Sequence, residues 1–235
     1  MIIFAYDTET TGLDTLKDEI IEVGGVLYSL DNYRTLESLG KLVKDNTISL
    51  SEEIKDKTGI TQKIIDTSGY DREDTLEHVV ECMHTADIIL THNGKRFDKP
   101  ITETWAKGKI DLPNKLWVDT FTDIPNVQGE KLVTMCANRG ILIMEAHSAL
   151  ADAQACLRLF LSYNTDEIIK RAKMPDIIVI AHHARSENEK AKKLKFRWNP
   201  DNKVWWKSIK EEDIEVFAKT CPFDISIADK NLILE

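Results

Sequence analysis

Two acidic residues, Asp7 and Glu9, stand two positions apart where an apolar N-terminal run ends. The run itself, residues 2–6, is partly β-branched, which predicts a buried strand. Because side chains alternate along a strand, both carboxylates would leave the same face, a few ångströms apart. Neighbouring buried carboxylates repel each other unless a cation lies between them, and hard oxygen ligands favour Mg²⁺ or Mn²⁺ over zinc. The pair by itself also fits a carboxylate paired with Arg or Lys, or a strand that has simply ended.

Two further acids, Asp98 and Asp152, stand near the start of predicted helices. Alone, an acid in this position fits stabilisation by the helix dipole. His147 precedes Asp152 by five residues, and a single histidine is more often structural than catalytic. His92 and Asn93 lie in the loop that leads to Asp98. None of these stretches therefore decides a function by itself.

Taken together and in order, the stretches resemble the DEDDh exonuclease family, which includes the proofreading epsilon subunit of bacterial DNA polymerase III. The resemblance covers roughly residues 1–165, and a histidine five residues before the last acid separates this branch from the tyrosine-bearing one. It implies a ribonuclease-H-like fold that removes nucleotides from a 3′ end with two divalent metal ions. The matching motifs are Asp7-x-Glu9-x-Thr-Gly, residues 93–98, and His147-x-Ala149-x-x-Asp152.

The resemblance also implies roles for the charged residues. Asp7 would bridge the two ions, and Glu9 and Asp152 would complete one of the metal sites. Asp98 would help to hold the other ion. His147 would be the general base that takes a proton from the attacking water, a task that suits imidazole at neutral pH. Two Mg²⁺ or Mn²⁺ ions about 3.5–4 Å apart would clamp the attacking and leaving oxygens of the phosphodiester.

Substrate contacts follow from the same resemblance. The segment after the first motif holds the terminal nucleotide in the family, which implies that role for Thr10, Gly12 and Leu13, although Gly12 also fits a simple turn. His92 and Asn93 fall where the family lines its substrate channel. We expect the 3′ end of nucleic acid as the substrate, with single-stranded DNA favoured over RNA. The sequence carries no readable signal for selection of a 2′-hydroxyl.

The elements that must position these residues predict an α/β domain. Strand-like runs over 19–30 and 36–43 follow the first strand, which predicts an antiparallel meander. Helices and short strands then alternate, as in a mixed sheet flanked by helices. We expect this ribonuclease-H-like domain over 1–174, with a boundary before Pro175. Its further predicted elements are helices at 49–57, 72–85, 95–107, 131–139, 148–163 and 166–173, and strands at 87–91 and 116–120.

A small α+β accessory domain is expected over 175–235, with strands at 176–182 and 203–209. Between residues 185 and 210, nine Lys/Arg oppose three acids, and Trp198, Trp205 and Trp206 lie among them. Residues 176–210 resemble an accessory module of exonuclease-X-like nucleases. Basic groups interleaved with aromatics are typical of single-strand binding. The alternative is that the tryptophans form a small core beneath a solvated lysine face.

Composition bounds the class of protein. The chain has 235 residues and a formal charge of −9, with 42% hydrophobic and 30% charged residues, as in a soluble globular protein. No run of about 18 apolar residues occurs, so we expect no membrane span and a cytoplasmic location. The four cysteines lack CxxC spacing, which indicates reduced thiols. His78 and Cys82 share a helical face, where a partly buried pair is favoured over a metal site.

Two rival functions stay open at this point. The first is a proofreading or targeting subunit that serves mainly to dock to a polymerase. The second is an inactive nucleic-acid-binding module, which a missing motif acid would support, yet all four acids and the histidine are present.

Overall fold

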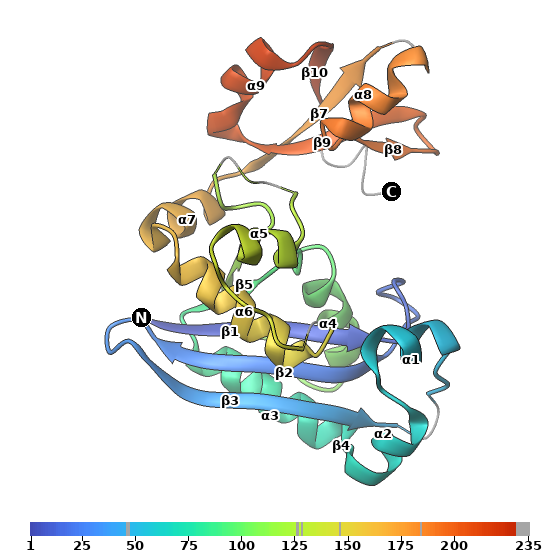
Figure 1. The fold of residues 1–235 in the computed structure, drawn as a ribbon, viewed down its shortest axis with the longest axis vertical. Coiled ribbons are helices and arrows are strands. Elements are labelled where there is room, and N and C mark those ends of the chain that lie inside the picture. The colour runs from blue at the N-terminus through green and yellow to red at the C-terminus, as the bar shows by residue number, and fades with distance from the viewer. Residues whose placement is uncertain (46–47, 126, 128, 146, 184, 229–235) are drawn as a thin grey trace. The chain divides into compact units, whose positions relative to one another are not determined.

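The computed structural model describes residues 1–45, 48–125, 127, 129–145, 147–183 and 185–228. The chain forms two compact units, residues 1–172 and 173–235 (Figure 1). The division comes two residues before the boundary expected ahead of Pro175. Residues 229–235, the end of the expected accessory domain, lie outside the described residues.

The first unit is built on a six-stranded sheet with the order β4-β3-β2-β1-β5-β6. The strands β1, β2 and β3 form the predicted antiparallel meander, and β5 and β6 run parallel to β1. This arrangement confirms the mixed sheet expected from the sequence. The bounds are β1 Ile2–Thr10, β2 Ile20–Ser29, β3 Arg34–Lys44, β4 Tyr70–Asp71, β5 Ile88–Thr91 and β6 Leu116–Asp119.

Helices cover both faces of this sheet, and the alternation along β1 determines which residues meet each layer. Phe4 and Tyr6 pack with α3 and α4, whereas Ile3 and Ala5 pack with α5, α6 and α7. Figure 1 shows α6 lying across β1 and β2, with α3 on the opposite face. The bounds are α1 Glu52–Thr58, α2 Gln62–Ser68, α3 Arg72–Thr85, α4 Asp98–Ala106, α5 Leu132–Asn138, α6 Ala149–Leu161 and α7 Thr165–Ala172.

Local signals account for the starts of α1 and α3. Ser51 caps α1 by accepting the Ile54 N–H, and Asp71 caps α3, whose bounds match the prediction. The prediction for α4 was wrong at its start, which is Asp98 rather than residue 95. The preceding residues make tight turns instead, because Asn93 adopts a left-handed conformation with φ of 65°.

The second unit has a four-stranded sheet with the order β10-β7-β9-β8 and two α-helices among its described residues. Its small core contains Val179, Phe196 and Phe223, with Trp205 packed against it. Strands β8 and β10 were not predicted, because a three-residue strand and a half-exposed five-residue strand carry too little hydrophobic pattern. The bounds are β7 Asp176–His182, α8 Asn188–Lys193, β8 Arg197–Asn199, β9 Val204–Lys210, α9 Ile214–Thr220 and β10 Asp224–Ala228. Across the described ranges, no helix combines the length and apolar character needed to cross a bilayer.

Candidate active site

The centre of the sheet presents the first acid pair. Asp7 lies opposite Gly24 of β2, and Glu9 lies opposite Glu22. Both acids leave β1 on the same side as Ala5, which is the side covered by α6. Glu9 is only 6% exposed, so its carboxylate is removed from most of the surrounding water.

Helix α6 begins directly against this acid pair. Gly24 permits the approach, because a Cβ atom there would lie 2.0 Å from the carbonyl carbon of Ala149. Glu22 holds the helix start, since its Oε2 accepts the Ala149 N–H at 3.1 Å. Asp152 lies in the first turn of the helix, and a carboxylate oxygen of Asp152 is within 4.8 Å of one of Glu9.

Asp98 reaches the same end of the sheet from the other helical layer. It is the first residue of α4 and is almost fully buried. The Thr8 hydroxyl donates to its Oδ1 at 2.6 Å, which ties the carboxylate to β1 between Asp7 and Glu9. The two layers therefore deliver acids to one point at the end of β1.

His147 lies at the edge of this cluster. Its side chain is exposed, and one ring nitrogen lies within 4.8 Å of carboxylate oxygens of Glu9 and Asp152. The residue adopts a left-handed conformation with φ of 69°, and its amide donates to Asp152 Oδ2 at 3.1 Å. The backbone is thus anchored to the site while the imidazole faces solvent. The structure brings together the four predicted acids and the predicted histidine.

The carboxylates destabilise one another's charged forms. Burial, with the charges of Asp98 and Asp152, raises the pKa of Asp7 well above its ordinary value. Burial raises the pKa of Glu9 to about 7 despite the attraction of Lys57, and burial raises that of Asp98 to about 7. Such a cluster of hard oxygen donors at neutral pH has the composition of a divalent cation site. The donor set therefore fits the metal dependence that DEDDh exonucleases share.

Glu22 is a member of the cluster that the sequence analysis missed. Burial raises its pKa, while hydrogen bonds from Ala149 and Ser148 oppose that rise. Glu22 lies opposite Glu9 because of the register between β1 and β2. The sequence predicts the antiparallel meander, but it does not predict which residues of the two strands face each other. Its bond to α6 joins residues more than a hundred positions apart and has no local signal.

The segment after β1 is compact around one carboxylate. The Thr10 hydroxyl donates to the Gly12 carbonyl at 2.6 Å, and the Thr11 hydroxyl donates to Asp18 at 2.9 Å. A Cβ atom at Gly12 would lie 2.5 Å from the Asp18 carboxylate, so a larger residue there would have to displace that side chain. Leu13, three residues after the end of β1, is 83% exposed.

Hydrogen bonds to Asp119 fix the loop after β5, and Asp119 is a second residue that the sequence analysis missed. Asp119 Oδ1 accepts the Asn93 N–H at 2.6 Å, and its Oδ2 accepts the Lys95 N–H at 3.2 Å. Asn93 Oδ1 is buried and has no hydrogen-bond partner within the described chain. His92 bonds to the Thr120 hydroxyl at 2.8 Å, and burial lowers its pKa to about 4, so its ring is neutral.

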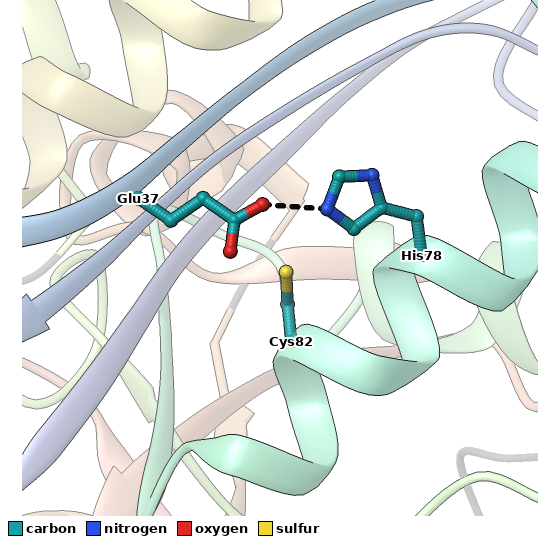
Figure 2. A group of neighbouring side chains, drawn as sticks. All are labelled: Glu37, His78 and Cys82. Atoms are coloured by element: carbon teal, nitrogen blue, oxygen red, sulfur yellow. Dashed lines mark hydrogen bonds and ion pairs between the residues drawn. The ribbon is translucent and has the colours of Figure 1, made fainter.

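A second group of potential ligands lies away from these acids. Figure 2 shows Glu37 of β3 pointing toward His78 of α3, with the Cys82 sulfur directed at the pair. His78 Nε2 and Glu37 Oε1 are 2.6 Å apart, and one ligand atom from each residue lies within 4.8 Å of the others. Burial raises the pKa of Cys82 to about 12, so its thiol is protonated at neutral pH. The group therefore consists of a hydrogen-bonded pair, His78 and Glu37, beside the buried thiol of Cys82.

Comparison with solved structures agrees with this fold. The chain superposes on the complex of Escherichia coli exonuclease I with single-stranded DNA, with a TM-score of 0.62 and 16% identity over 77% of this chain and 48% of that one. It also superposes on the nuclease domain of 3′hExo, a DEDDh family member bound to rAMP, with a TM-score of 0.55 and 21% identity over 70% and 92% of the two chains.

Sequence comparison reaches larger proteins. The PolC-type DNA polymerase III of Thermotoga petrophila is 27% identical over 161 residues, which are 67% of this chain and 11% of the polymerase. That of Listeria monocytogenes is 28% identical over 177 residues, 72% of this chain and 11% of the polymerase. The chain thus spans about a tenth of the length of these relatives.

The family comparison covers most of the first unit. Residues 4–160 match the RNase T family, whose description is "Exonuclease". This range includes α4 and nearly all of β1 and α6, the elements that carry the four acids, and it also includes His147. The chain therefore belongs to the RNase T exonuclease family.

Proposed function

We propose that the protein hydrolyses nucleic acid from its 3′ end, releasing nucleoside monophosphates, with single-stranded DNA as the favoured substrate. The observation that carries the proposal is the convergence of Asp7, Glu9, Asp98 and Asp152 on one point, with His147 beside them. A binding module would have no use for buried carboxylates that raise one another's pKa values and repel a phosphate backbone.

We infer a role for each acid toward the metal ions. Asp7, at the centre of the cluster, would contact both ions, and Glu9 and Asp152 from facing elements would hold one of them. Asp98 would hold the second, with its other oxygen kept in place by the Thr8 hydroxyl. Two Mg²⁺ or Mn²⁺ ions would supply Lewis acidity and charge stabilisation to the phosphodiester oxygens.

His147 is the residue that we propose as general base. Its exposed ring can accept a proton from a water molecule at the cluster, and its anchored amide keeps it within reach of Glu9 and Asp152. The turn at Thr10 and Gly12, with the exposed Leu13, would hold the terminal nucleotide through backbone groups and one apolar contact. His92 and Asn93 would line the path of the strand.

The test uses 5′-labelled single-stranded DNA, duplex DNA and RNA of one length, each incubated with Mg²⁺, Mn²⁺ or EDTA. We expect a ladder that shortens from the 3′ end, requires the cation, and is strongest for single-stranded DNA. Asp7→Asn should abolish it, whereas Asp111→Asn, a change at an exposed acid outside the cluster, should not. Intact oligonucleotides in every lane, from protein with a normal thermal melt, would refute the proposal.

A second candidate is a proofreading component that acts beside a polymerase. It is favoured by one observation: the relatives that match this chain are PolC-type DNA polymerases III. Proofreading predicts faster removal of a mispaired than of a paired 3′ nucleotide from a primer–template duplex. Equal rates on the two duplexes would favour a general exonuclease instead.

A further inference from the structure

The second unit contains a cavity that the exonuclease chemistry does not use. Its volume is about 970 Å³, near the upper end for ligand pockets, and all of its lining comes from residues 180–205. The apolar lining includes Ala181 of β7 and Val204 of β9. A cavity of this size can take a nucleobase together with its sugar and phosphate.

Two tryptophans give the cavity an aromatic wall. Trp198 of β8 and Trp205 of β9 are cross-strand partners, and their ring centroids are 5.7 Å apart. Trp205 packs against the small core, whereas Trp198 is 47% exposed and contributes little to that core. Exposure of so large an aromatic side chain, beside a partly buried one, is what a stacking platform requires.

The rim of the cavity is cationic. Arg185, Lys192 and Lys203 line it together with His182, and no carboxylate is found among the described residues that form the lining. Lys192 also pairs with Glu189 on the outer surface at 2.8 Å, but such exposed pairs are weak and exchange readily. A basic rim is notable here because the whole chain carries a formal charge of −9.

We propose that this cavity binds single-stranded nucleic acid, with a base stacked on Trp198 and the adjacent phosphate held by Lys203 and Arg185. The choice of nucleic acid as the ligand rests on the exonuclease function proposed above. The presence of the cavity and its positive charge are observed independently of that function. An aromatic wall with a cationic rim matches the two parts of a nucleotide, its π-face and its phosphate. The second unit would then hold the strand independently of the catalytic metal site.

The test measures binding of the full chain to 5′-fluorescein-labelled oligothymidylate by anisotropy in EDTA, which suppresses hydrolysis and removes metal-assisted binding. Trp198→Ala should weaken binding about tenfold, and Trp198→Phe, which keeps a ring, should largely retain it. Lys203→Ala should weaken binding and reduce the slope of log affinity against log salt by about 0.7. The matched control is Lys219→Ala, because Lys219 is exposed on α9 of the same unit but does not line the cavity.

The possible results separate this proposal from the previous one. Wild-type affinity in both Trp198→Ala and Lys203→Ala, from folded protein that still degrades DNA with Mg²⁺, would overturn the cavity assignment alone. Cavity-dependent binding by a protein that degrades nothing would overturn only the exonuclease proposal. Displacement of the oligonucleotide by an equal concentration of dTMP or of polyglutamate would overturn the cavity assignment. The first result would show a mononucleotide site, and the second a general polyanion site.

Discussion

Glu9→Gln should stabilise the metal-free protein while it removes exonuclease activity. Burial raises the pKa of the Glu9 carboxyl from an ordinary 4.5 to about 7 in the folded state. A carboxyl with a raised pKa binds more protons in the folded than in the unfolded state between these two values. Stability therefore falls as pH rises from about 4.5 to about 7, and the full loss is present above that window.

The structure sets the size of the effect. The difference between 4.5 and about 7 corresponds to about 3 kcal/mol of unfolding free energy, and the 6% exposure of Glu9 leaves little solvent screening. In a unit of this length the gain is roughly 6–12 °C in Tm. An amide of the same shape removes the charge without opening a cavity.

The assay is thermal unfolding in EDTA at pH 8 and again near pH 5, for wild type, Glu9→Gln and Glu77→Gln, a change at an exposed glutamate of α3. We expect stabilisation by Glu9→Gln at pH 8, little difference near pH 5, and no effect of Glu77→Gln at either pH. Adding Mg²⁺ at pH 8 should stabilise the wild type more than Glu9→Gln. A Glu9→Gln protein that melts at or below the wild-type Tm at pH 8 would refute the reasoning.

Three further changes test other parts of the site. His147→Ala should lower the exonuclease rate by about 10²–10⁴ without shifting Tm, because the side chain is exposed; a normal rate in the gel assay would exclude it as the base. Gly24→Ala should lower stability by about 1–3 kcal/mol and reduce activity, because the new methyl displaces the start of α6. Gly40→Ala is its control in denaturant unfolding, since there a Cβ would meet only a movable leucine side chain. Asp119→Ala should destabilise the first unit by at least about 3 kcal/mol in the same assay, because three backbone N–H groups lose their acceptor.

Local patterns in the sequence determined most of the elements and the identity of the predicted site residues. The alternation in β1 places Asp7 and Glu9 on one face, and α3 spans the residues expected for it, with Asp71 as its cap. These features depend on neighbours within a few positions, so a linear sequence contains them. The order of the three motifs also carried the family, which the match over residues 4–160 confirms.

Only the tertiary structure decided which distant groups share a contact. Three contacts join segments far apart in the chain. Helix α6 packs against Gly24, the Ala149 N–H donates to Glu22, and the Asp119 carboxylate accepts N–H groups of the 92–95 loop. Likewise, strand alternation separated Trp205 from Trp206, but it did not show that Trp198 would be the exposed ring. Burial and charge repulsion arise from such long-range packing. For that reason the raised pKa values of the acids follow from the tertiary structure and could not be predicted from the sequence.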